Sequence, residues 1–101
     1  MISRHGIVED LAQARRELAA MRRKRKGFVA WECACLDLIF RFRAEANSEP
    51  LMAHLKDALG QAGEKRRLCT SKLAEMGRRI SALEAVAWVD LAPRLAGTQE
   101  C

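Results

Sequence analysis

The spacing of apolar residues constrains what this chain can fold into more than any other feature. In two long stretches, apolar residues recur at intervals of three and four, which aligns them along one side of an α-helix. The segment Glu45–Pro50 interrupts this pattern. We therefore predict an all-α fold, an antiparallel hairpin of two long helices. The helices are expected at about residues 5–46 and 49–90, with the turn at about residues 45–50.

Local signals indicate where these helices begin and end. Ser48 suits the N-cap of the second helix, and Pro50 is tolerated in its first turn. The second periodic stretch ends before Pro93, which is typical of a helix stop. Residues 1–93 are therefore predicted to form a single helical-hairpin domain, and residues 94–101 a flexible C-terminal tail.

Glycine residues mark two weak points, because glycine destabilises a helix interior by up to about 1 kcal/mol relative to alanine. Gly27 places one of them at residues 26–27, where we expect the first helix to continue. Gly60 and Gly63 place the other at residues 60–63, where a break would give three helices instead of two.

The hairpin also predicts which residues face each other. If the chain folds back about Ser48, facing residues have numbers that add up to about 96. This register places Gly60 and Gly63 opposite the bulky stretch at residues 31–36, where their small size leaves room for large side chains.

Apolar side chains between residues 28 and 42 fall on nearly every side of the first helix. One partner helix covers a stripe only about 100° wide or somewhat more, so a two-helix hairpin leaves part of this surface uncovered. Exposed apolar surface of this kind marks an interface, although a third helix or a bent chain would also cover it. The predicted docking residues are Phe28, Val29, Trp31, Leu36, Leu38, Phe40 and Phe42. We expect a homodimer that forms a four-helix bundle, or a heteromeric coiled coil with another protein.

Positive charge is concentrated in two segments. Residues 15–26 and 65–79 together contain thirteen basic and two acidic residues, and the predicted register brings the segments together. Such a band is a solvated face, a surface for an acidic protein, or a site for nucleic-acid phosphates. Arginine favours the last of these, because the guanidinium group contacts phosphate in a bidentate manner. The candidate residues are Arg15, Arg16, Arg22, Arg23, Arg25, Lys26, Arg66 and Arg67.

The sequence contains no pattern that predicts catalysis or metal binding. Cys33 and Cys35 are two residues apart, which directs their side chains about 200° apart on a helix and prevents them from holding one ion together. We expect reduced, buried cysteines and one loose thiol at Cys101. There is no glycine-rich phosphate loop and no arrangement of serine, histidine and acid, so we expect no enzyme, cofactor, metal or small-molecule substrate.

Hydropathy predicts a protein that is not integral to a membrane. No apolar run approaches the roughly 18 residues that a membrane span needs, and the N-terminus lacks the pattern of an export signal. A cytoplasmic location is expected, and the abundance of arginine and alanine suits a GC-rich bacterial genome. The predicted function is a non-enzymatic protein-protein interaction module of the adaptor, co-chaperone or scaffold type. The alternative is a small basic regulator that binds nucleic acid through its Arg/Lys band.

Overall fold

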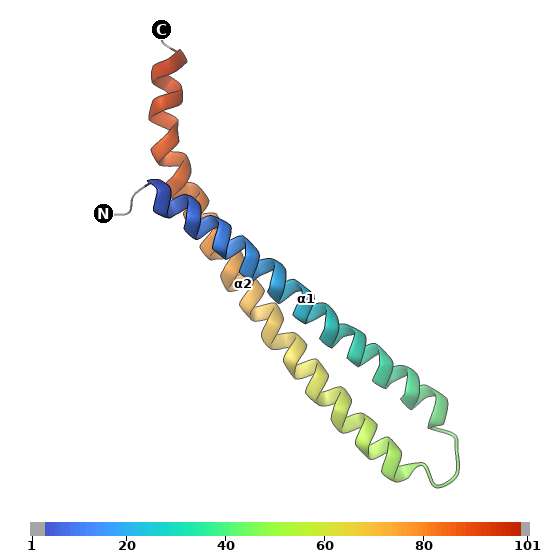
Figure 1. The fold of residues 1–101 in the computed structure, drawn as a ribbon. Coiled ribbons are helices and arrows are strands. Elements are labelled where there is room, and N and C mark those ends of the chain that lie inside the picture. The colour runs from blue at the N-terminus through green and yellow to red at the C-terminus, as the bar shows by residue number, and fades with distance from the viewer. Residues whose placement is uncertain (1–3, 100–101) are drawn as a thin grey trace. The chain divides into compact units, whose positions relative to one another are not determined.

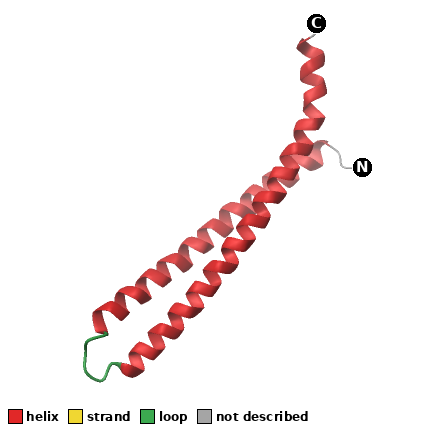
Figure 2. Cartoon of the chain, turned by 180° about the vertical axis from the view of Figure 1, so that it is seen from behind, coloured by secondary structure: helices red, strands yellow, loops and turns green. Residues whose placement is uncertain are grey.

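The computed structural model describes residues 4–99 of the chain, and side chains for residues 6–89. It contains two helices, α1 (Arg4–Phe42) and α2 (Glu49–Gln99), joined by a short loop (Figure 1). Over the described range no residue is in a β-strand, as the colouring in Figure 2 shows. The predicted all-α helical hairpin is confirmed.

The hairpin divides into two compact units, each made of one segment from each helix. Unit 1 comprises residues 1–20 and 73–101, and unit 2 comprises residues 21–72, which include the loop. In each unit the α1 segment lies beside the α2 segment (Figures 1 and 2).

The loop at residues 43–48 explains why α1 ends earlier than predicted. The amide of Glu45 donates to the carbonyl of Phe42 at 3.1 Å, which closes a tight turn after the helix. Asn47 then adopts a left-handed conformation with φ of 60°, which asparagine tolerates better than most residues and which an α-helix cannot include. The predicted helix end at residue 46 is therefore wrong, and the helix stops at Phe42.

Ser48 occupies the position predicted for the helix cap. Its carbonyl accepts a hydrogen bond from the amide of Met52 at 2.8 Å, the first bond of α2. Glu49 and Pro50 form the first turn of α2, where proline lacks only an amide that would have no helical partner.

Both helices continue through their glycines. Residues 26–27 lie inside α1 and residues 60–63 inside α2, so neither predicted weak point becomes a break. Glycine destabilises a helix by about 1 kcal/mol relative to alanine. This is small compared with the cost of ending a helix and leaving its backbone groups unpaired.

The C-terminal end of α2 lies beyond the predicted one. The helix passes through Pro93 and ends at Gln99, so the expected end at residue 90 is wrong. A proline inside a helix removes one backbone hydrogen bond and bends the helix, but does not always terminate it. The expected tail at residues 94–101 is thus helical as far as Gln99, and Cys101 lies outside the described residues.

Unit 1 is held together by a small apolar core. Ile7, Leu11 and Ala14 from α1 are buried against Ile80 from α2. Leu18, Leu83 and Ala87 pack around this cluster. The α1 residues of the core are spaced by four and three, so the periodicity in the sequence identified this face correctly.

Unit 2 buries few side chains, all of them small or aliphatic. Cys35 comes from α1, and Leu55, Ala62 and Cys69 come from α2. The two cysteines act here as small apolar residues, as expected, whereas Cys33 is exposed.

The predicted register holds within each unit. Arg15 pairs with Glu84 in unit 1, and Arg25 pairs with Thr70 in unit 2. The numbers in each pair add up to within three of 96.

Candidate docking surface of unit 2

A polar layer joins the two helices of unit 2 at the positions where the apolar pattern of α1 is interrupted. Glu32 accepts a hydrogen bond from Nε of Arg66, and the two side chains are only 18% and 30% exposed. Arg25 donates through Nε to Thr70 Oγ1 at 2.8 Å, and this hydroxyl donates to the backbone carbonyl of Arg66 at 3.0 Å. Two hydrogen bonds therefore join the helices, and Thr70 links them through the backbone carbonyl of Arg66.

The polar layer contains two of the predicted basic residues. Arg25 and Arg66 are bonded inside the hairpin, so their guanidinium groups serve the fold. In unit 1, Arg15 pairs with Glu84 at 3.0 Å, and Arg16 donates to Gln13 at 2.7 Å.

Four of the eight candidate basic residues remain exposed on unit 2. They are Arg22, Arg23, Lys26 and Arg67. None of the four has a salt bridge within the described part of the chain. Unit 2 as a whole contains twelve basic and six acidic residues.

The seven predicted apolar docking residues do not share one surface. Successive helical residues are rotated by about 100°, so Val29, Leu36 and Phe40 lie on one side of α1, whereas Trp31 and Leu38 lie on another side, about 170° away. The residues that face α2, Glu32 and Cys35 among them, separate the two sides. Phe28 and Phe42 are half-buried near this interface.

The first side, which we name the apolar stripe, consists of Val29, Leu36 and Phe40. Leu36 is 52% exposed and Phe40 is 66% exposed, and Val29 is half-buried. The guanidinium carbon of Arg43 lies 4.4 Å from the centre of the Phe40 ring, a cation–π contact at the end of the stripe.

On the other side, aromatic rings of α1 meet a lysine of α2. The ring centres of Phe28 and Trp31 are 6.5 Å apart, and Trp31 is 37% exposed. Lys65 Nζ lies 5.7 Å from the Phe28 ring centre and 6.0 Å from that of Trp31. The two rings thus hold the Lys65 ammonium over the edge of the helix interface.

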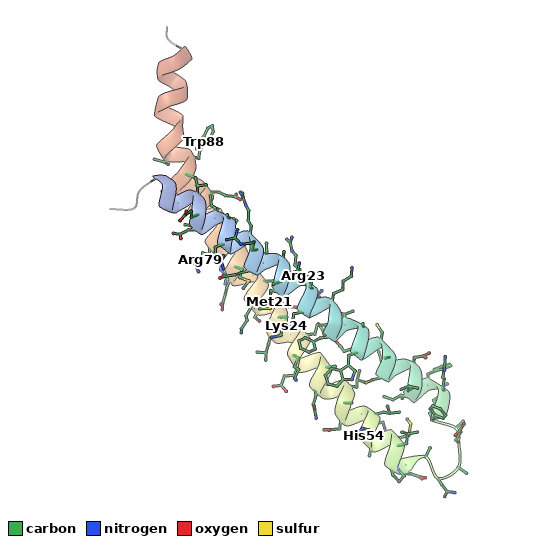
Figure 3. All side chains as sticks on the ribbon, viewed as in Figure 1. Met21, Arg23, Lys24, His54, Arg79 and Trp88 are labelled. Atoms are coloured by element: carbon green, nitrogen blue, oxygen red, sulfur yellow. The ribbon has the colours of Figure 1, made fainter. Side chains whose placement is uncertain are left out.

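Next to this contact is a groove of about 250 Å³, which we name the lysine groove. Met21 and Phe28 from α1 and Leu68 and Cys69 from α2 supply its apolar lining. Lys24, Lys65 and Lys72 supply its charge. Met21 and Lys24 are labelled in Figure 3, about one turn apart on α1.

Phe28 is the only predicted candidate residue that lines this groove, although Lys24, Lys65 and Lys72 belong to the two basic segments. The predicted register contained the missing signal, because it places Lys24 opposite Lys72 and Phe28 opposite Leu68. The predicted apolar candidates all lie on α1, so they omit the apolar lining that Leu68 and Cys69 of α2 supply.

No group of three or more metal-ligating side chains occurs among the described residues. Within that same range neither helix has a segment long and apolar enough to cross a membrane. Comparisons with protein-family models, with curated proteins and with solved structures found no match to this chain.

Proposed function

We propose that this protein is a non-enzymatic protein-protein interaction module of the adaptor, co-chaperone or scaffold type. It docks through the apolar side chains of α1 in unit 2. The observation that carries the proposal is the exposure of Leu36 and Phe40, both on the apolar stripe, after α2 has packed against α1. When a partner covers these side chains, the binding free energy becomes more favourable by about 25 cal/mol for every Å² of apolar surface removed from water.

The chemistry of this region is that of protein interfaces. Aromatic residues and arginine are enriched at interface cores, and Phe40 and Arg43 supply them at the apolar stripe. The cation–π contact between Arg43 and Phe40 restrains both side chains before binding, which lowers the entropy lost on docking.

The partner is a second copy of this chain or another protein. Two hairpins that pack through their apolar stripes would complete a four-helix bundle, whereas a helix of another protein would complete a heteromeric coiled coil. A cytoplasmic location in a bacterial cell is part of the same proposal.

Site-specific photo-crosslinking in the cell tests this proposal. A benzophenone amino acid is introduced at Leu36 or Phe40 in the full chain, and the crosslinked products are identified by mass spectrometry. Glu64 and Asp57, both exposed on α2, are the control positions. We expect a discrete protein product from the α1 positions and none from the controls. The same products from all four positions, or none from Leu36 and Phe40, would overturn the proposal.

A second candidate, nucleic-acid binding, is favoured by one specific observation. Arg22, Arg23, Lys26 and Arg67 are exposed and free of salt bridges within the described residues. A salt titration of binding to random DNA and RNA separates the two candidates, because affinity for phosphates falls steeply with ionic strength. Docking through apolar surface depends far less on salt.

A further inference from the structure

We propose that the lysine groove binds an acidic amphipathic helix of a partner protein. This inference rests on the proposed function and names the chemistry of the partner. The inference is independent of the predicted apolar docking residues, because six of the seven residues that line the groove are not among them.

The size of the groove favours a few side chains over a whole small molecule. Pockets for drug-sized ligands have volumes of roughly 300–1,000 Å³ and enclose most of the ligand. The lysine groove is smaller, at about 250 Å³, and it is open to solvent. An apolar lining of this size suits one or two anchoring side chains of a helix that lies along the outside, the helix-in-groove mode of recognition.

The charge around the groove specifies an anionic partner. Lys24, Lys65 and Lys72 surround an apolar lining, and none of them forms a salt bridge with a described residue. Three ammonium groups in one place repel each other, and carboxylates on a partner would relieve that repulsion. Unit 2 carries twice as many basic as acidic residues, which adds a longer-range attraction for an acidic partner.

The spacing of the lysines matches a helix rather than a point anion. Lys65 and Lys72 are seven residues apart, so they lie on the same side of α2 and about 10 Å apart along its axis. Acidic residues seven apart on a partner helix have the same spacing. Met21, Lys24 and Phe28 follow the helical spacing of three and four along α1, so the groove follows the helix axes.

A second copy of this chain is a poorer occupant on grounds of charge. The chain has a net charge of +5, so two copies repel each other at long range. An anionic membrane would satisfy the lysines, and it is therefore included as one arm of the test.

The test uses the full chain and a fluorescent synthetic helix of leucine and glutamate, with its glutamates seven residues apart beside a leucine face. The groove variant carries Lys24→Glu, Lys65→Glu and Lys72→Glu. The control variant carries Lys26→Glu, Lys56→Glu and Arg67→Glu, which makes the same change in net charge at exposed positions outside the groove. We expect the groove variant to lose at least tenfold in peptide affinity by fluorescence anisotropy, and the control variant to lose at most about threefold.

Leu68→Asp provides a second variant that keeps the lysines. Leu68 is 58% exposed, so its replacement should leave helicity by circular dichroism unchanged. We expect it to weaken the peptide at least fivefold. A peptide of the same composition with its leucines dispersed should bind at least tenfold more weakly than the amphipathic one.

Several results would overturn the inference. One is an equal loss of affinity in the groove and control variants, and another is equal binding of the dispersed peptide. Binding to phosphatidylglycerol vesicles but not to the peptide would identify a lipid surface as the occupant. Dimerisation that is lost only in the groove variant would identify a second copy. If Leu36 and Phe40 still give crosslinks to a protein, the proposed function stands without the groove; if they give none, the proposed function fails independently of the peptide result.

Discussion

Glu32 of α1 is bonded to Arg66 of α2 at a position where the apolar pattern of α1 is interrupted, and both side chains are mostly shielded from solvent. Apolar contacts alone tolerate a helix sliding by one turn, because the pattern repeats. A slide would leave these two charges unpaired in the interface, which is costly. We infer that the polar layer fixes the register of unit 2.

The first prediction concerns this ion pair. Glu32→Ala leaves Arg66 without its partner in a half-buried position. Exposed ion pairs contribute at most about 1 kcal/mol, and breaking fully buried ones costs about 3–5 kcal/mol. We expect an intermediate loss of about 1–2 kcal/mol in the free energy of unfolding, measured by urea denaturation.

Glu84→Ala is the matched control for that variant. Glu84 pairs with Arg15 at 3.0 Å, but both side chains are more than half exposed. We expect the free energy of unfolding to change by less than about 0.5 kcal/mol. Equal losses in the two variants would show that the Glu32–Arg66 pair has no special role in the fold.

The second prediction compares two glycines of α2. A Cβ atom at Gly60 would meet nothing within 4 Å, so Gly60→Ala should stabilise the helix by about 0.5–1 kcal/mol. A Cβ atom at Gly63 would lie 3.5 Å from Oε2 of Glu32, where a methyl group displaces water from the carboxylate. We therefore expect Gly63→Ala to gain less than Gly60→Ala in thermal melts. A larger gain at Gly63 would contradict this account.

The contrast between these glycines shows how far the sequence could predict the structure. The register correctly placed Gly63 opposite residues 31–36, because its nearest neighbour on α1 is Glu32. It did not predict that Gly60 would be exposed, or that Gly63 would face a carboxylate instead of an aromatic ring. The register determines which residues lie at the same height along the two helix axes. The rotation of each helix about its own axis determines which of their side chains are in contact.

Helix ends were the least predictable part for a related reason. Asn47 ends the hairpin turn through a left-handed backbone conformation, which the apolar pattern does not encode. Proline is a residue type that typically ends a helix, but α2 continues through Pro93. Each local signal of this kind changes the free energy of helix formation by only a few kcal/mol, which the rest of the helix can outweigh.

The third prediction is that the isolated chain self-associates at micromolar concentration, because its apolar stripe is uncovered. Sedimentation velocity should show a dimer or larger species. Phe40→Asp should shift the chain towards monomer, since it puts a charge into the stripe. A wild-type chain that stays monomeric without aggregating at these concentrations would contradict the prediction.

Trp88→Asp is the control for that experiment and should matter less. Trp88 is 62% exposed on α2 in unit 1, where it is labelled in Figure 3. Its exposed neighbours Val86 and Val89 point in other directions around the helix, because they are two positions before it and one after it. Val86 and Val89 are three positions apart and share one side of α2, and Trp88 lies on a different side.

The last prediction separates basic residues that serve the fold from those available to a polyanion. Arg22, Arg23 and Lys26 are exposed, and replacing them with glutamine keeps good helix propensity, so the free energy of unfolding should not change. Unit 2 should bind random duplex DNA weakly at low salt through its charge alone. In the triple variant the slope of log affinity against log salt should flatten by about 0.9 for each lost phosphate contact, or about 2.7 for three.

Arg25→Ala should behave in the opposite way, because Arg25 donates to Thr70 across the helix interface. Losing that hydrogen bond should lower the free energy of unfolding by about 0.5–1.5 kcal/mol, while the salt slope for DNA changes by less than in the triple variant. Urea denaturation and a salt titration on the same preparations measure both quantities. If Arg25→Ala flattened the salt slope as strongly as the triple variant and left stability intact, Arg25 would contact phosphate, and the polar layer would not depend on it.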